Sequence, residues 1–306
     1  RAALNRLVEK DVPQKTIDMI EKMVVADRTA RTRDAESIIA AFGGEPEQSD
    51  ALASPSAHNA ELQPGDEHDA ITIVELIAES KTSQVYRAKA VGGRNVALKL
   101  FNREVPRETI VNECMNTHSI RSSYVVGCDG RPGYWKSDRY FIVLDYIDGE
   151  SMRTMIERGH RPEHESFRAV ANALMQAVRA FHERTDAEGN IKPLLHNDIK
   201  PDNVLVTGDH RAVLIDCGIS SEPRVGTYAG SPGYVPPDSI LGTDMQFSES
   251  GDLFALGVTL WEWLFGRKPY LDPSIGDAPD TPGFVPDYAL PYVPWLRKAV
   301  ATDAHE

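Results

Sequence analysis

The chain has 306 residues, of which 41% are hydrophobic, and a formal net charge of −13 at pH 7. This length can bury a sizeable core and accommodates one large domain with an appendage. The negative charge argues against a general nucleic-acid-binding surface, and no apolar run approaches the length of a membrane span. Cys114, Cys128 and Cys217 show neither metal nor disulfide spacing, which favours a reducing, cytoplasmic setting.

The first 70 residues divide into two segments. Apolar residues at helical spacing predict two or three helices in residues 1–42, closed by Gly43 and Gly44. Residues 43–70 contain seven acidic residues and neither lysine nor arginine. Such a segment cannot bury enough apolar surface to offset its ordering entropy, so we expect a flexible linker, with an acidic docking site as the alternative.

From Ile71 onward, strands come first and helices later. This order predicts an α+β fold with a β-rich amino-terminal lobe and a helical carboxy-terminal lobe. The predicted strands are 71–78, 84–90, 95–101, 124–127 and 140–146, and the predicted helices are 107–118, 151–158, 165–183 and about 250–265.

The segment from His196 to Asn203 reads His-Asn-Asp-Ile-Lys-Pro-Asp-Asn, and Asp216-Cys217-Gly218 begins thirteen residues after Asn203. Two short apolar runs between these motifs predict a hairpin whose ends meet at one site. An aspartate can orient a hydroxyl nucleophile, a lysine can neutralise a phosphoryl group, and an asparagine with a second aspartate can hold Mg²⁺. The pattern therefore indicates phosphoryl transfer.

These motifs resemble those of Hanks-type, bacterial-like serine/threonine protein kinases. The resemblance runs from about residue 71 to the end and also rests on Val96–Lys99, Glu113, Gly230–Asp238 and Asp252. It implies a two-lobed kinase fold, ATP and Mg²⁺ as cofactors, and a protein substrate.

The resemblance assigns a role to each matching residue. Asp198, Lys200 and Asn203 would be catalytic, Asn203 and Asp216 would hold the metal, and Ser231 would bond Asp198 and Lys200. His196 is better interpreted as structural. The residues expected to bind ATP are Ile77, Val85, Ala97, Lys99, Glu113, Asp145, Ile147 and Leu205.

The two ends of the chain suggest a tandem arrangement. Residues 1–42 resemble the carboxy-terminal end of a preceding kinase-like domain, and a similar pattern begins again at Trp295. We therefore expect residues 71–306 to be a second kinase domain that lacks its last helices; a private helical extension is the alternative. Tandem kinase-like domains with this style of catalytic loop resemble the large kinases of bacterial phage-defence systems, although no single motif carries that likeness.

Several positions depart from the family pattern. Ala78, Ser80 and Ser83 replace the glycines of the phosphate loop, Asn197 replaces an arginine, and Cys217 replaces a phenylalanine. Thr117 also stands where an apolar residue is usual. These departures favour a pseudokinase as the alternative to an active serine/threonine kinase. A small-molecule phosphotransferase is a further alternative, which Lys200 and Gly230–Asp238 oppose. The sequence does not name a substrate, a pathway or a regulating signal.

Overall fold

The computed structural model describes residues 61–301 with internal gaps. The gaps are Ser137, Ala187, Ile219, 222–223, 227–229, 237–244 and 271–284. The helices predicted in residues 1–42, and the predicted linker up to residue 60, lie outside the described residues. The tandem arrangement therefore stays a prediction.

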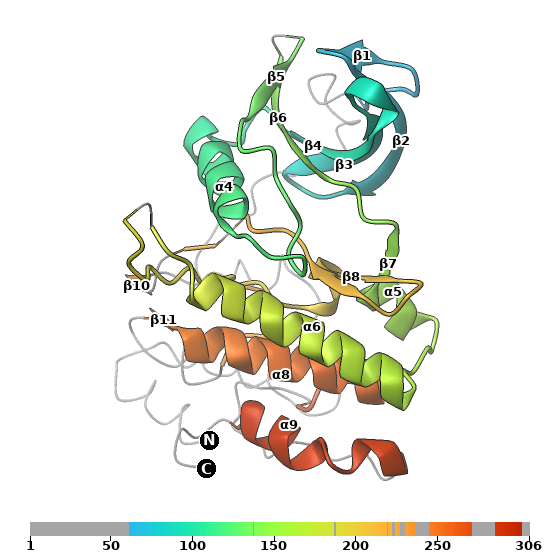
Figure 1. The fold of residues 1–306 in the computed structure, drawn as a ribbon, viewed down its shortest axis with the longest axis vertical. Helices are drawn as coiled ribbons and strands as arrows, with labels where there is room; N and C mark the ends of the chain where they lie inside the picture. The colour runs from blue at the N-terminus through green and yellow to red at the C-terminus, as the bar shows by residue number, and fades with distance from the viewer. Residues whose placement is uncertain are drawn as a thin grey trace, which may run out of the picture. The chain divides into compact units, whose positions relative to one another are not determined.

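A six-stranded antiparallel sheet forms the amino-terminal part (Figure 1). Its strands follow the order β1-β2-β3-β4-β6-β5, and helix α4 (Arg107–Ser119) packs against β6. The strands are β1 (Glu67–His68), β2 (Ile71–Glu79), β3 (Ser83–Lys89), β4 (Asn95–Phe101), β5 (Gly133–Trp135) and β6 (Arg139–Asp145). A 3-10 turn at Val91–Gly93 joins β3 to β4. Alternate residues of β3 are buried, as a strand with one face on a core requires.

The predicted linker boundary at residue 70 lies too far along the chain. β1 pairs with β2, and the Leu62 side chain packs against the core of the sheet. The Leu62 N–H also donates a hydrogen bond of 2.9 Å to the Tyr86 hydroxyl. The acidic composition obscured this edge strand, because backbone pairing leaves the charged side chains exposed to solvent.

Three further segments differ from the prediction. Residues 124–127 do not form a strand; Val125 makes an isolated bridge to Leu214, and Cys128 makes one to Leu144. β5 was not predicted, and neither was β7 (Gly149–Ser151), which precedes helix α5 (Met152–Glu157). These segments are three residues long, too short for a periodic pattern to show.

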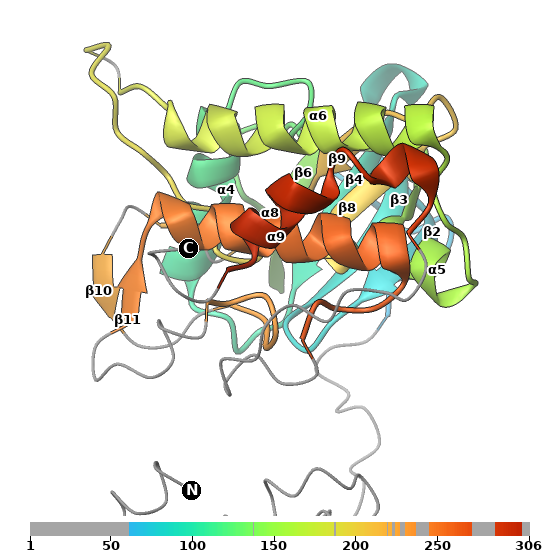
Figure 2. The same ribbon diagram turned by 90° about the horizontal axis from the view of Figure 1, so that it is seen from below.

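The carboxy-terminal part is mainly helical (Figure 2). α6 (His164–His182) and α8 (Glu249–Phe265) pack against each other, and α9 (Val293–Ala299) packs on α8. The predicted apolar face of α6 is buried, and α8 ends at Gly266, whose positive φ closes the helix. The remaining elements are the sheet β7-β8-β9 with β8 (Val204–Thr207) and β9 (Ala212–Leu214), the pair β10 (Arg224–Gly226) and β11 (Met245–Phe247), and 3-10 turns at Pro201–Asn203 and Asp287–Ala289.

Separate hydrophobic clusters stabilise the two parts. One large cluster joins α5, α6, α8 and α9. Of two smaller clusters, one lies on the six-stranded sheet and the other lies between that sheet and α4. The strand-rich part thus precedes the helical part, as predicted. Within the described ranges, none of the helices is long and apolar enough to cross a bilayer.

Candidate active site

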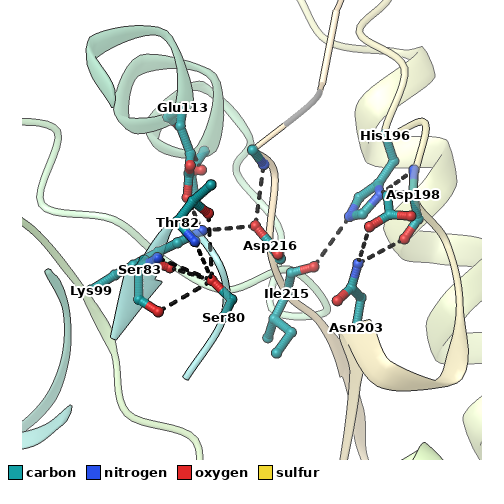
Figure 3. Close-up of polar contacts among 12 residues, drawn as sticks. Ser80, Thr82, Ser83, Lys99, Glu113, His196, Asp198, Asn203, Ile215 and Asp216 are labelled. Atoms are coloured by element: carbon teal, nitrogen blue, oxygen red, sulfur yellow. Dashed lines mark hydrogen bonds and ion pairs between the residues drawn. The ribbon is translucent and has the colours of Figure 1, made fainter. Parts of the chain in front are cut away.

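Lys99 joins three separate parts of the chain. It lies on β4 and is 8% exposed, and its Nζ donates to Glu113 Oε1 on α4 at 2.6 Å (Figure 3). The same Nζ donates to Asp216 Oδ1, just beyond β9, at 2.9 Å. The structure therefore forms the predicted Lys99–Glu113 pair and adds Asp216 to it.

The electrostatics follow from two carboxylates sharing one ammonium group. Burial disfavours the charged form of Lys99, but Asp216 and Glu113 outweigh burial and raise its pKa. Burial favours the neutral form of Asp216, yet the attraction of Lys99 prevails and lowers its pKa. For Glu113, burial prevails over Lys99 and raises the pKa. The excess of negative charge suits the binding of a cation beside Asp216.

Asp198 is held by three side chains. Its Oδ2 accepts hydrogen bonds from Lys200 Nζ at 2.8 Å and from Asn203 Nδ2 at 3.0 Å. Its Oδ1 accepts one from the Ser231 hydroxyl at 2.6 Å, and Lys200 also donates to Ser231 at 2.7 Å. Because a carboxylate offers about four acceptor sites, Asp198 can still accept a hydrogen bond from a substrate hydroxyl.

The backbone before Asp198 is fixed by Asp252 of α8. Asp252 is 2% exposed, and it accepts hydrogen bonds from the main-chain N–H groups of His196 and Asn197, both at 2.9 Å. It also contacts His182 Nε2 at 3.0 Å. Asn197 has a φ of 65°, a left-handed conformation that needs such support. Asp252 therefore positions the loop that carries Asp198.

His196 is a packing residue. It is fully buried, and Phe181 meets its ring edge-on. Its Nδ1 accepts a hydrogen bond from the Asp198 N–H, and its Nε2 donates to the Ile215 carbonyl, both at 3.3 Å. Burial lowers its pKa, so the ring is neutral and both nitrogens are occupied. The interpretation of His196 as structural is confirmed.

Asn203 and Asp216 fit a magnesium ion. The Asn203 carbonyl accepts from the Ile215 N–H at 2.9 Å, which places Asn203 beside the residue before Asp216. The Asn203 amide nitrogen is committed to Asp198, so the amide oxygen is left for a metal. Amide and carboxylate oxygens are ligands that Mg²⁺ prefers. Asp216, like Asn197, has a positive φ, here 64°.

Val85, Ala97 and Lys99 lie on one face of the sheet. Val85 pairs with Lys99 across β3 and β4, and Ala97 lies two residues before Lys99. On β8, Leu205 is half-buried while its neighbours Val204 and Val206 are buried in the helical core. Alternation along the strand therefore points Leu205 away from that core, as a residue contacting a ligand requires.

The remaining predicted ATP-binding residues are Ile77 on β2, Asp145 at the end of β6 and Ile147 just after β6. Ile77 is exposed on β2. The Asp145 N–H donates to Gly127 O at 2.9 Å, and the Ile147 carbonyl accepts from Gly149 N at 3.0 Å. Neither bond uses the Asp145 carbonyl or the Ile147 N–H, which are the groups on these residues suited to read an adenine edge.

The phosphate loop is ordered by a serine hydroxyl in place of glycine. Ser80 Oγ accepts from the N–H groups of Thr82 at 3.3 Å and Ser83 at 3.1 Å. The Ser80 N–H donates to the Ser83 carbonyl at 2.8 Å. None of Ala78, Ser80 and Ser83 takes a positive φ, so the turn forms without the conformational freedom of glycine.

Polar contacts accompany the other departures. Thr117 is buried on α4, where its hydroxyl donates to the Glu113 carbonyl at 2.7 Å and contacts the buried Cys217. Asn197 Nδ2 donates to Ser221 Oγ at 3.0 Å.

Sequence reasoning missed Asn116, whose Nδ2 donates to the Ser220 carbonyl at 2.9 Å and links α4 to the segment after Asp216. No local sequence signal announces a contact between residues so far apart.

Comparison with known proteins identifies the family of the chain and two relatives. Residues 71–278 match the family described as protein kinase domain. The chain is 26% identical over 213 residues to MAP kinase kinase MKK1/SSP32 of Saccharomyces cerevisiae, covering 66% of this chain and 40% of that protein. It is 27% identical over 221 residues to serine/threonine-protein kinase A of Synechocystis sp., covering 64% and 40%. The matched regions thus span well under half of either relative.

Proposed function

This chain belongs to the protein kinase domain family, and we propose that it is an ATP- and Mg²⁺-dependent serine/threonine protein kinase. One observation supports the proposal: two groups of polar side chains are formed, and Asn203 joins them, because its carbonyl accepts from the Ile215 N–H beside Asp216 while its Nδ2 donates to Asp198. Lys99 bridges Glu113 and Asp216, while Lys200 and Ser231 hold Asp198.

Each residue then has a defined task. Lys99 binds the phosphates that stay on the nucleotide after transfer, and Glu113 holds Lys99 in place. Asn203 and Asp216 would hold Mg²⁺, which would supply positive charge to the phosphate oxygens when bound. Asp198 orients the substrate hydroxyl and accepts its proton, and Lys200 neutralises charge on the phosphoryl group in transit. Ser231 bonds both Asp198 and Lys200 and keeps the two side chains in place, which supports a serine or threonine acceptor.

Asp198→Asn tests the proposal with labelled ATP and a generic protein substrate. Turnover should fall by at least about 100-fold, because the variant loses the proton acceptor. ATP affinity should stay within a few-fold, because Lys99 and Asp216 are unchanged. Asp209→Asn in the exposed β8–β9 turn is the matched control and should retain turnover. Equal turnover in Asp198→Asn would refute the role of Asp198, and phosphotyrosine as the main product would refute the substrate class.

A nucleotide-binding pseudokinase is the second candidate, and the phosphate loop favours it. Ser80 Oγ occupies the N–H groups of Thr82 and Ser83, which would otherwise be available to phosphate oxygens. Binding of ATP without transfer to any hydroxyl, in the presence of Mg²⁺, would support this candidate. The small-molecule phosphotransferase is disfavoured by the Lys200–Ser231 contact, which belongs to a peptide-directed site.

A further inference from the structure

Two cysteines that are distant in sequence meet behind the Lys99–Glu113 pair. Cys114 Sγ on α4 lies 3.5 Å from Cys128 Sγ. Both are free thiols; Cys114 is buried and Cys128 is half-buried. A disulfide needs the sulfurs about 2.05 Å apart, so side-chain rotation with a small backbone shift is enough to close the gap.

The backbone around the pair is fixed on both sides. Cys128 bridges to Leu144 of β6, and its carbonyl accepts a 2.8 Å contact from His118 Nδ1, one helical turn beyond Cys114. Cys114 packs in the small cluster with Phe101, Ile110 and Ile142, and Cys128 covers the edge of that cluster. The two sulfurs therefore stay opposed rather than meeting by chance.

The two thiols differ in reactivity. A hydrogen bond from Cys114 lowers the pKa of Cys128, and the Gly130 N–H and His118 act in the same direction. The same bond, with burial, raises the pKa of Cys114. Cys128 is half-buried whereas Cys114 is buried, so peroxide reaches Cys128 more easily, and Cys114 lies 3.5 Å away, placed to resolve the oxidised form of Cys128. By contrast, Cys217 is buried, which shields that thiol from peroxide.

We propose that Cys114 and Cys128 form a reversible, peroxide-driven disulfide. The bond would tether α4, at the residue after Glu113, to the segment that carries Cys128. The Cys128 thiolate attacks hydrogen peroxide; an S–O bond forms, the O–O bond breaks, and the leaving hydroxide takes a proton to become water. Cys114 sulfur then attacks Cys128 sulfur, the S–S bond forms, and the second hydroxide leaves with the Cys114 proton as water. In total, two thiols and one peroxide give one disulfide and two waters, with two electrons passing to the peroxide.

The tether acts on the helix that carries Glu113. In the reduced protein, the described contacts that hold α4 against its surroundings are noncovalent, among them the Lys99–Glu113 pair and the His118 contact. Because the sulfurs already face each other while Lys99 and Glu113 are paired, the bond fixes α4 in that arrangement. Oxidation should therefore preserve nucleotide binding and raise the thermal unfolding midpoint by several degrees.

The test treats the purified chain with hydrogen peroxide, alkylates remaining thiols after denaturation, and maps the peptides by mass spectrometry. The expected product is one cross-linked peptide pair, Cys114 with Cys128, and an alkylated Cys217; dithiothreitol should reverse it. Cys128→Ser should lose both the cross-link and the rise in unfolding midpoint, while Cys217→Ser should keep the cross-link. Mapping and melting are independent of phosphoryl transfer, so failure of the proposed kinase activity would leave this result unaffected.

Three outcomes would overturn the proposal. One is Cys128 oxidised to sulfinic or sulfonic acid with Cys114 still alkylated. Another is a disulfide between two molecules. The third is a cross-link that forms but lowers the unfolding midpoint or abolishes ATP binding, which would contradict the tethering of α4 in its present position. The peptide mapping is done on the wild-type chain, so instability of a serine variant does not affect it.

Discussion

Replacing Asp252 with asparagine tests whether the helical core fixes the catalytic loop. Asp252 Oδ2 accepts from the His196 N–H and contacts His182, while Oδ1 accepts from the Asn197 N–H. Asparagine keeps the size but has one oxygen. If that oxygen serves His196 and His182, the new NH₂ group faces the Asn197 N–H, where donor meets donor.

The cost can be worked from these contacts. Losing one hydrogen bond to a charged acceptor and leaving a partly buried N–H unsatisfied costs about 2–4 kcal/mol. For a domain of this size, such a loss lowers the unfolding midpoint by roughly 5–15 °C. Asn197 also loses the restraint on its positive φ, so Asp198 moves with it. A displacement of about 1 Å at Asp198, which orients the nucleophile, can cost roughly 100-fold in turnover.

The assay combines thermal unfolding with steady-state phosphorylation measured well below the unfolding midpoint. The expected pattern is a lower midpoint, a large loss of turnover and an unchanged affinity for ATP, because Lys99 and Glu113 lie in the other part of the molecule. Asp209→Asn is the matched control on an exposed turn. An Asp252→Asn variant that melts within 1 °C of the wild type, and turns over within about twofold, would refute this account of the loop.

Three further predictions follow from the site. Ser80→Gly should tighten ATP binding several-fold in calorimetry, because it frees the Thr82 and Ser83 N–H groups for phosphate; weaker binding would show that loop order matters more. Because burial lowers the folded-state pKa of His196, stability should fall as pH drops below about 6.5, and His196→Gln should lose part of that slope in urea titrations at pH 7.5 and 5.5. Thr227, which lies outside the described residues, aligns with the residue that is usually phosphorylated in the family. Thr227→Ala should keep turnover within a few-fold, because Asn197 stands where an arginine would bind that phosphate; a loss of 100-fold would mean that another cation replaces the missing arginine.

The sequence indicated the side chains suited to phosphoryl transfer better than it indicated the contacts that hold them in place. Asp198, Asn203 and Asp216 were identifiable because phosphoryl transfer demands those groups at those spacings. The contacts of Asn116 with Ser220 and of Cys114 with Cys128 were not, because each joins segments that only the folded chain brings together. β1 was missed for a different reason: its pairing uses backbone groups, and Glu67 lies among acidic residues that are typical of a linker.

Several departures from the family pattern share one physical feature, which is that small polar groups take the place of charge, bulk or conformational freedom. Ser80 orders its turn through its hydroxyl, Asn197 binds Ser221 through a neutral hydrogen bond, and Thr117 is satisfied within α4. Such bonds each contribute about 1 kcal/mol, less than a buried aromatic ring provides. A site held this way depends more on its fixed backbone, and in particular on Asp252, than on apolar packing between the strand-rich part and the helical part. Hence the loss of Asp252 should exceed, in its effect on turnover, the loss of any one of these polar substitutes.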